Sequence, residues 1–373
     1  MQNLVKTSYS GDDVQILLKD LTGALPPLST EEREKNIQSG THYSEMLPLE
    51  YVPTAQYFDL YEKSLANNAR KIALYTAVLA EKLLNIHGEN MIIISLARAG
   101  IPIGILVKRY LKFKTGKDFP HYSISIIRGK GIDVNALEFI RSKHPNNIKH
   151  FQFLDGWTGK GAINNQLYEA VEDLKITDGI WSELDPELAV LADPCNICEL
   201  CGTHDDVLIP SSCLNSTVSG LVSRTILRND LIDIKHGDFH GAVYFKDLVQ
   251  SDVSYEFIES VEYYFSKLDN YEFNMAYLNS REIEHKPGIE YLRAVQTHYD
   301  VQDINLIKPG IGETTRILLR RVPWKILINS SSRYDSDLDH IYRLCKEKNV
   351  EFERFGLGGY KCCGIIKNLS ADA

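Results

Sequence analysis

The sequence predicts an α/β protein, with a doubly wound parallel sheet, an added helical segment and a small C-terminal α/β domain. The first observation is a set of short, largely apolar runs, which are typical of parallel strands covered on both faces. These runs lie at residues 91–95, 122–127, 151–154 and 187–192. The second is that segments with helical spacing alternate with them, at residues 59–84, 102–112, 135–142 and from 162 onward. The third is that glycines and charged residues follow the strands, so we expect a ligand across their carboxyl ends.

Composition indicates an ordinary globular protein, since 44% of the 373 residues are hydrophobic and 24% are charged. No apolar run of about eighteen residues occurs, and residues 1–10 do not resemble a signal peptide, so we expect a cytoplasmic protein without membrane contact. Seven cysteines, an odd number, favour reduced thiols over a disulfide framework. We expect a body at residues 1–300, with an N-terminal arm at 1–45 and a helical addition at about 245–285, and a second domain at 301–373.

The stretch FQFLDGWTGKGAI, residues 151–163, predicts a strand, an anion-binding loop and the start of a helix. The loop consists of Gly156, Trp157, Thr158, Gly159, Lys160 and Gly161. Its glycines let backbone amides point inward, and the following helix adds its positive N-terminus. Its threonine and lysine supply a hydroxyl and a cation for a phosphate, and the preceding Asp155 suits a sugar hydroxyl or a metal. The Walker pattern is missing, and an ordinary strand-to-helix turn is the alternative.

Two other predicted strands end in loops of similar chemistry. The run at 91–95 leads into Ala97, Arg98, Ala99 and Gly100. The run at 122–127 leads into Arg128-Gly129-Lys130-Gly131. Cations at such positions can stabilise the charge that develops on a leaving group. Three consecutive strand ends therefore carry loops suited to anions.

The order of these loops resembles a type I phosphoribosyltransferase. SLARAGIPIG resembles its pyrophosphate loop, SIIRGKGID stands in place of its flexible catalytic loop, and FLDGWTGKGAI resembles its PRPP loop. A closer resemblance rests on HYSEMLPLEY, HYSISIIRGKGID, LNSTVSGLVSRT and DFHGA. These motifs resemble a bacterial family of tellurium-resistance stress operons, described as phosphoribosyltransferases with a C-terminal Pelota-type RNA-binding domain. That family also carries the label cysteine protease StiP, and the resemblance covers essentially the whole chain.

The resemblance implies a PRPP-dependent transfer to a base or nucleotide, or the reverse cleavage by pyrophosphate, with Mg²⁺ bound together with PRPP. It implies catalytic roles for Asp155, Arg128 and Lys130, and PRPP contacts for residues 97–100 and 156–161. The sequence departs from the transferases at one point. Their PRPP loop usually carries two adjacent acids, whereas Gly156 follows Asp155 here.

A cysteine cluster follows the run at 187–192. Cys195, Cys198 and Cys201 have the spacing C-x2-C-x2-C, with His204 and Cys213 nearby. Thiolates at this spacing can converge on Zn²⁺ or on an iron–sulfur cluster, and reduced, partly buried thiols are the alternative. A thiol peptidase is a second enzyme class, with Cys213 or a cysteine of the triplet as nucleophile and His240 or His204 as base.

The segment LNSTVSGLVSRT, residues 214–225, mixes small polar and apolar residues around a glycine. Such a segment can pass close to a ligand, so Asn215, Ser219 and Arg224 are candidates for contacts to the acceptor base or nucleotide, together with His240. A buried crossover with satisfied hydroxyls, and a core histidine, are the alternatives.

The C-terminal part differs in charge from the body. Residues 1–300 hold 29 basic and 41 acidic side chains, a net −12, whereas residues 301–373 hold 12 and 9, a net +3. The Gly-rich loop KPGIGETTR opens a helix, and its resemblance to the Pelota-type domain implies RNA contacts. The candidate residues are Lys308, Gly310, Gly312, Thr314, Arg316 and Arg320. A loop that merely caps a helix is the alternative, and a non-catalytic RNA-binding regulator that senses PRPP or a nucleotide is a third function.

Overall fold

The computed structural model describes residues 3–281, 287–331 and 335–367, with the backbone alone at Thr30, Glu34, Gln38 and Arg320. Its centre is a sheet in the order β1-β6-β5-β8-β9-β10, and β7 pairs with β6. The pairs along this path are parallel, and β7 runs antiparallel to β6. The strands are β1 (Gln15–Ile16), β5 (Ile92–Ala97), β6 (His121–Ile127), β7 (Gly131–Ile132), β8 (Phe151–Trp157), β9 (Leu188–Ala192) and β10 (Cys201–Thr203). The predicted α/β class with a parallel central sheet is confirmed.

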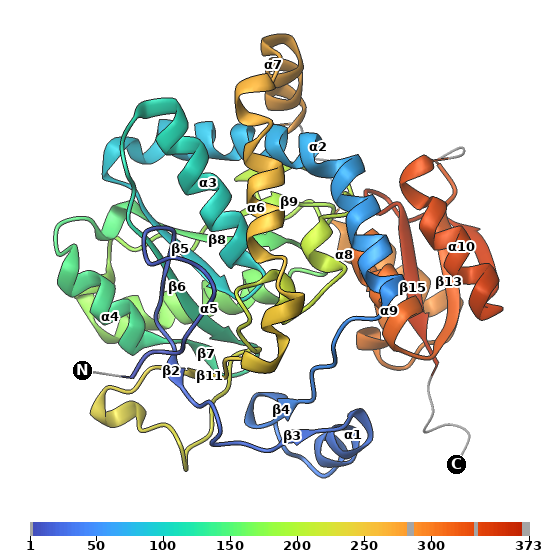
Figure 1. Ribbon diagram of the computed structural model, residues 1–373, viewed down its shortest axis with the longest axis horizontal. Coiled ribbons are helices and arrows are strands. Elements are labelled where there is room, and N and C mark those ends of the chain that lie inside the picture. Colours follow the sequence, from blue (N-terminus) through green and yellow to red (C-terminus); the bar gives the residue numbers. More distant parts are fainter. Residues whose placement is uncertain (1–2, 282–286, 332–334, 368–373) are drawn as a thin grey trace.

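Helices cover both faces of this sheet (Figure 1). One face carries α2 (Ala55–His87), α3 (Gly100–Thr115) and α6 (Ser254–Glu262), and the other carries α4 (Val134–Lys143) and α5 (Ala162–Thr177). Alternate residues of one strand serve the two cores, since Ile93 packs on the first face and Ile92 and Ile94 on the second. Burial on both sides explains why the predicted strands are almost continuously apolar.

The N-terminal residues are built into the body rather than only draped over it. β1 forms an edge of the central sheet, where Gln15 pairs with Tyr122. β2 (Lys19–Asp20) pairs with β11 (Gly241–Ala242). Beyond them lie β3 (Pro27–Leu28), α1 (Thr30–Gln38) and β4 (Leu47–Pro48), and β3 pairs with β4. The arm that the sequence predicts therefore begins only after a segment that belongs to the fold.

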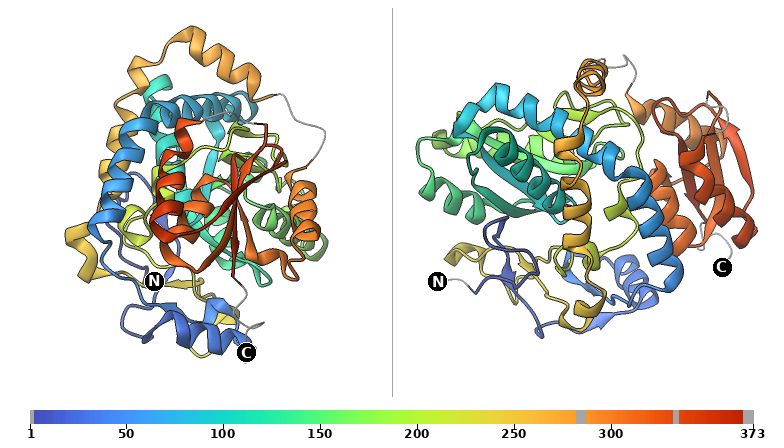
Figure 2. Two further views of the ribbon diagram at one scale, coloured as in Figure 1. Left: turned by 90° about the vertical axis from the view of Figure 1, so that its right-hand side faces the viewer. Right: turned by 45° about the horizontal axis from the view of Figure 1, so that its top comes forward.

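The C-terminal unit has its own four-stranded sheet, in the order β12-β15-β13-β14, which Figure 2 shows edge-on at the side of the body. Its strands are β12 (Ile307–Pro309), β13 (Pro323–Asn329), β14 (Phe352–Phe355) and β15 (Cys362–Ile366). One face carries α9 (Ile311–Arg320) and α10 (Asp339–Lys348), and α8 (Gly288–His298) covers the other. Because α8 packs on this sheet, the C-terminal unit begins before the predicted residue 301.

The two units share buried contacts. Cys195 of the body lies in the same apolar cluster as Leu292 and Ile307 of the C-terminal unit. The hydroxyl of Tyr57 on α2 donates to the carbonyl oxygen of Leu319 on α9 at 2.8 Å. Helix α7 (Asn270–Asn279) belongs to the predicted helical addition and projects above α2 (Figure 1). Within the described ranges, no helix is long and apolar enough to cross a lipid bilayer.

Candidate active site

The loop after β8 holds the two units together. Thr158 is buried and its hydroxyl donates to Asp193, so it does not face an open phosphate site. Lys160 Nζ donates to the carbonyl oxygens of Ile304 and Ile307 at 2.8 and 3.3 Å. Burial, together with the nearby charges of Lys308 and Arg128, lowers the pKa of Lys160 to about 8. The hydroxyl and the cation that sequence analysis assigned to a phosphate are therefore both engaged with the protein in this structure.

The remaining residues of this stretch also differ from the sequence prediction. β8 continues to Trp157, so Asp155 and Gly156 lie within the strand rather than after it. Burial raises the pKa of Asp155 to about 7, and its Oδ1 accepts the amide proton of Gly156 at 2.7 Å. The carbonyl oxygen of Gly159 accepts from the hydroxyl of Tyr360 at 2.6 Å. Gly161 has a φ of +81° and begins α5, as a glycine at that position allows.

The other two strand-end loops have different contacts. Arg98, between Ala97 and Ala99, donates to the carbonyl oxygen of Val222 at 3.0 Å. At Gly100 the helix α3 passes so close to β8 that an added Cβ would lie 2.5 Å from the carbonyl oxygen of Leu154. Arg128 and Lys130 are exposed, and Arg128 Nη1 donates to Asn305 of the C-terminal unit at 3.1 Å.

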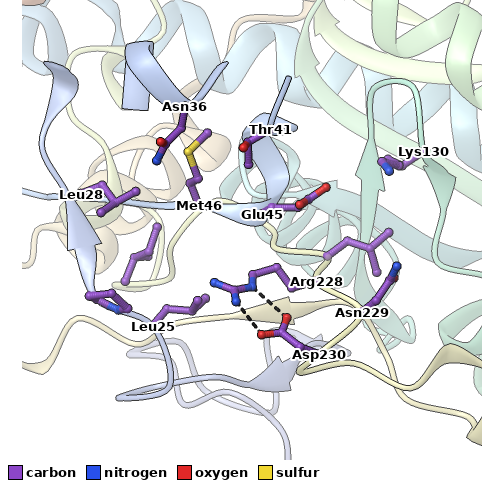
Figure 3. Close-up of a pocket in the computed structure, with 13 residues that line it drawn as sticks. Leu25, Leu28, Asn36, Thr41, Glu45, Met46, Lys130, Arg228, Asn229 and Asp230 are labelled. Carbon is purple, nitrogen blue, oxygen red and sulfur yellow. Dashed lines mark hydrogen bonds and ion pairs between the residues drawn. The ribbon is translucent and has the colours of Figure 1, made fainter. Parts of the chain in front are cut away.

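Lys130 lines a cavity of about 530 Å³ whose other lining residues come from outside these loops. Figure 3 shows this cavity, which the N-terminal segment forms with residues 227–230. Arg228 makes an ion pair with Asp230 at its edge, and neither cysteine nor histidine lines it. This cavity therefore offers no nucleophile–base pair.

The candidate acceptor residues divide into two groups. Asn215 and Arg224 line a second cavity, between the body and the C-terminal unit. Ser219 is buried, and its hydroxyl donates to the carbonyl oxygen of Asn215 at 2.9 Å. His240 is a core histidine: burial lowers its pKa to about 4, and its Nδ1 lies 2.9 Å from Ser125 Oγ. The structure agrees with the alternatives for these two residues: the hydroxyl of Ser219 is hydrogen-bonded within the fold, and His240 is a core histidine.

The KPGIGETTR loop does not present free amides to solvent. The amide of Ile311, at the N-terminus of α9, donates to both carboxylate oxygens of Asp206 at 3.0 and 3.1 Å. Gly310 and Thr314 are buried, and an added Cβ at Gly312 would lie 3.0 Å from Ser212 Oγ. The amide of Ile311 is therefore not available to a ligand, because the body supplies its acceptor.

Of the predicted RNA contacts, the cations remain partly accessible. Lys308 and Arg316 are half-buried, and both line the second cavity. The side chain of Arg320 lies outside the described residues. A role of Lys308, Arg316 and Arg320 in RNA binding stays a prediction.

The cysteines do not converge on a metal site. Cys195, Cys198, Cys201 and Cys213 are all free and buried. In the described part of the chain, no three His, Cys, Asp or Glu side chains are grouped so that they could hold a metal ion. The arrangement of the described residues thus gives the expected Zn²⁺ site no support, and that site stays a prediction.

One cysteine has a histidine partner. Cys201 Sγ, at the start of β10, lies 3.4 Å from His204 Nε2, just after the same strand. His204 Nδ1 lies 3.2 Å from the main-chain carbonyl oxygen of Asp193 and 3.3 Å from its carboxylate oxygen Oδ2, directly after the neighbouring strand β9. Because β9 and β10 are parallel and adjacent, with Thr203 opposite Ala192, their carboxyl ends bring these side chains together. The thiol thus contacts the imidazole, and the imidazole contacts the carboxylate. In this order the three groups can serve as a nucleophile, a base and a group that orients the base.

Asp193 is fixed from several sides. Its Oδ2 accepts the amide protons of Ile197 and Cys198 at 2.8 and 2.9 Å, and its Oδ1 accepts from Thr158. The side chain is fully buried. A carboxylate held in this way keeps its orientation toward the imidazole, as a second group behind a catalytic base requires.

His204 carries a proton over most of the accessible pH range. Burial alone would lower its pKa, but hydrogen bonds to Asp193 and Cys201 outweigh burial and raise the pKa to about 10. The arrangement therefore pairs a protonated imidazole with the sulfur of Cys201. In thiol enzymes a histidine beside the sulfur takes up and returns the proton during the reaction.

Sequence analysis named part of this constellation. It named the triplet as a source of the nucleophile and His204 as one of two candidate bases, but it did not name Asp193. The sequence showed only that Asp193 directly follows an apolar run, the place where polar site residues often lie. What the sequence lacked was the pairing of β9 with β10.

Comparison with known proteins agrees with a thiol enzyme. Residues 7–262 match the family described as tellurite-like stress resistance cysteine protease StiP. The chain belongs to the StiP family. A protein of Acinetobacter baylyi (strain ATCC 33305 / BD413 / ADP1), called cysteine protease StiP, is 35% identical over 371 residues. The alignment covers 97% of this chain and 94% of that relative.

The C-terminal unit matches a separate family. Residues 286–368 match the Pelota RNA-binding domain, which places its start close to α8. No solved structure matches the chain.

These matches correct the sequence analysis on function. The StiP family and the Pelota domain are confirmed, whereas the prediction of a PRPP-dependent phosphoribosyltransferase, in either direction, is wrong. The family and the relative carry the name of a cysteine protease, which was the second alternative. The physical reason for the error is visible in the loop after β8, where Thr158 and Lys160 bind protein groups.

Proposed function

We propose that this member of the StiP family is a cysteine peptidase with Cys201 as nucleophile, His204 as acid–base group and Asp193 as the residue that orients His204. The observation that carries the proposal is the chain of contacts from Cys201 Sγ to His204 Nε2, at 3.4 Å, and from His204 Nδ1 to Asp193 Oδ2, at 3.3 Å. The names of the family and of the Acinetobacter relative support the same class of reaction.

The chemistry follows from the three groups. The sulfur of Cys201 attacks the carbonyl carbon of a peptide, and a C–S bond forms while the proton of the pair resides on His204 Nε2. The C–N bond then breaks, and His204 gives that proton to the leaving amine. Water, deprotonated by His204, hydrolyses the thioester, which releases the acid and restores the pair. Asp193 keeps the ring in place throughout, because its hydrogen bond fixes Nδ1.

The segment that follows α7, part of the helical addition at about 245–285, covers the sulfur of Cys201. Cys201 is fully buried, and its Sγ lies 3.9 Å from the carbonyl oxygen of Ser280, directly after α7. Lys82 on α2 binds the carbonyl oxygens of both Cys201 and Ser280 at 2.9 Å. α7 contributes no buried side chain of its own. A substrate reaches Cys201 only when the segments that bury it, among them the one around Ser280, move aside.

The test compares two cysteines of the same loop. In wild-type protein, iodoacetamide should alkylate Cys201 before the other thiols, and fluorescently labelled casein should be cleaved. Cys201→Ala should abolish both signals, whereas Cys198→Ala should keep both, because Cys198 Sγ faces Asn164 Oδ1 at 3.8 Å and not a histidine. Equal loss of hydrolysis in the two variants, with native melting temperatures, would exclude Cys201 as the nucleophile.

A second function is supported by a different observation. We propose that the C-terminal unit binds RNA, since residues 286–368 match the Pelota RNA-binding domain and residues 301–373 carry a net charge of +3. Retention of RNA by the full chain at low salt, with weaker binding as salt increases, tests this proposal. Binding that does not change with salt would count against contacts between its cations and RNA phosphates.

A further inference from the structure

A cavity of about 590 Å³ lies where the body meets the C-terminal unit. The body contributes residues 48–54, Arg98 and the segment around Thr217, and the C-terminal unit contributes Lys308 and one side of α9. None of its lining residues belongs to the Cys201–His204–Asp193 constellation. The cavity is therefore a separate site, and both units are needed to form it.

Its lining is strongly cationic. Six basic side chains line it: Arg33, Arg98, Arg224, Lys308, Arg316 and Arg321. Only two carboxylates lie among the lining residues, Glu50 and Glu313. Oε1 of Glu50 lies 3.7 Å from Nη2 of Arg98, and Oε1 of Glu313 accepts a hydrogen bond from Nη1 of Arg316 at 2.9 Å. An excess of positive charge remains, although the body as a whole is acidic.

The cations are held close together at an electrostatic cost. Burial, together with the charges of Arg33 and Arg98, lowers the pKa of Arg224 to about 10. Burial also lowers the pKa of Lys308, and Arg321 adds to the effect. Like charges collected in a partly desolvated cavity are stabilised when an anion occupies it. The unfavourable free energy of holding these cations together indicates an anionic ligand. Phosphate groups fit best, because one guanidinium group can donate two parallel hydrogen bonds to phosphate oxygens.

Two further side chains narrow the class of ligand. Thr217 is 2% exposed and lines the cavity, and its Oγ1 has no hydrogen-bond partner within the described residues. Tyr51 lines the same cavity but is 70% exposed. An unpaired hydroxyl can serve a phosphate or sugar oxygen, and an exposed aromatic ring can stack on a base. A phosphate, a sugar and a base are the three parts of a nucleotide.

We propose that this cavity binds a nucleotide, either free or as part of an RNA strand, with its phosphate among Arg98, Arg224 and Arg316 and its base against Tyr51. The inference deepens the RNA binding proposed for the C-terminal unit, because it assigns a place where the body shares the RNA contact. It is independent of the peptidase chemistry.

The experiment uses the full chain and fluorescence anisotropy. The probe is a single-stranded RNA of about ten nucleotides, within the usual site size of such proteins, labelled at its 3′ end. AMP and ATP compete in separate titrations, and RNA with a 5′-phosphate is compared with RNA that has a 5′-hydroxyl. The variants are Arg224→Gln, Arg316→Gln and Tyr51→Ala. The matched control is Arg343→Gln, a half-exposed cation on α10 that does not line the cavity.

We expect Arg224→Gln and Arg316→Gln each to weaken binding about tenfold, as for removal of a charge-assisted hydrogen bond to phosphate. The slope of log affinity against log salt should fall by about 0.7 for each phosphate that the variant no longer neutralises, and Arg343→Gln should change neither quantity. Tyr51→Ala should weaken binding without changing that slope, and its exposed position protects it from misfolding.

The outcomes separate the two sources of the ligand. Competition by AMP or ATP identifies a free nucleotide, whereas binding of RNA alone identifies a strand, and both support the cavity if its variants weaken binding. RNA that binds equally well to wild type, Arg224→Gln and Arg316→Gln would overturn this inference while leaving RNA binding by the C-terminal unit intact. Direct binding of a fluorescently labelled ATP, abolished in the variants and with no RNA binding in any protein, would support the cavity and overturn the RNA proposal. Failure of every probe to bind would overturn both.

Discussion

The carboxylate of Asp206, two residues after His204, accepts the amide proton of Ile311 at the N-terminus of α9. Both carboxylate oxygens take part, at 3.0 and 3.1 Å, and Oδ2 also accepts the amide proton of Lys361 at 2.9 Å. Burial raises the pKa of Asp206 to about 6, although the hydrogen bonds favour its ionised form. One side chain of the body therefore supplies the acceptor for two buried segments of the C-terminal unit, a few residues from the proposed catalytic histidine.

Asp206→Ala should weaken the docking of the C-terminal unit. The change leaves the buried amide of Ile311 and the partly buried amide of Lys361 without an acceptor and removes a charged group at a helix N-terminus, so we expect a loss on the order of 2–4 kcal/mol in the free energy of unfolding. Urea unfolding measures it. The matched control is Asp205→Ala, whose exposed carboxylate accepts from Tyr75 and should cost less than about 1 kcal/mol. Equal losses in both variants would contradict the role of Asp206.

Asp193→Asn should impair catalysis while the substrate still binds. The amide side chain keeps the size of the carboxylate but removes the negative charge 3.3 Å from His204 Nδ1, so the imidazolium loses its counter-ion while the main-chain carbonyl of residue 193 still accepts from Nδ1. We expect kcat to fall on the order of 100-fold or more with KM nearly unchanged. Casein hydrolysis checks the effect, and Asp205→Asn is the control. An unchanged kcat would remove Asp193 from the mechanism.

Much of the body could be predicted from the sequence. The strand predicted at 91–95 and the helices predicted at 59–84 and 135–142 correspond to β5, α2 and α4, since burial leaves a clear apolar pattern in the sequence. The edge strand β1 could not be predicted, because two residues carry no periodicity. The boundary near residue 286 was also missed, because it depends on α8 packing against the C-terminal sheet.

The contacts of these loops show why their sequences alone led to the wrong function. A loop rich in glycine, hydroxyl groups and lysine offers many hydrogen-bond donors. Its sequence does not show whether a bound phosphate or another part of the protein supplies the acceptors. Lys160 meets the carbonyl oxygens of Ile304 and Ile307, and the amide of Ile311 meets Asp206. Each loop resembles a phosphate site and instead joins two parts of the same chain. The link from Cys201 to Asp193 was equally out of reach, because it depends on strand order.

Gly202 and Gly159 should respond differently to substitution by alanine, because the space around them differs. An added Cβ at Gly202 in β10 would lie 2.4 Å from the carbonyl oxygen of Tyr75 on α2, whereas nothing lies within 4 Å of one at Gly159. Because the nearest obstacles around Gly202 are backbone atoms, Gly202→Ala should cost about 1–3 kcal/mol or more in unfolding free energy. Gly159→Ala should change it by less than about 0.5 kcal/mol. A large loss for Gly159→Ala would restore a special role for that loop.

The raised pKa of His204 makes its contribution to stability depend on pH in a predictable direction. An unfolded histidine titrates near 6.5, whereas hydrogen bonds to Asp193 and Cys201, working against burial, raise the folded value to about 10. The folded protein therefore holds this proton more tightly than the unfolded chain. The resulting stabilisation is fully present below about pH 6.5 and is lost as the pH rises toward 10.

His204→Gln isolates this contribution, because groups elsewhere titrate similarly in both proteins. We expect the unfolding free energy of wild type to exceed that of His204→Gln by the largest margin near pH 6, and the margin to shrink by at least about 1 kcal/mol as the pH rises toward 10. Urea unfolding at several pH values measures both curves. In an Asp193→Asn background the pH dependence of the margin should be much smaller, because the main hydrogen bond that holds the proton is gone. A margin that grows with pH would mean that His204 is neutral in the folded protein, and the imidazolium required by the proposed mechanism would then be absent.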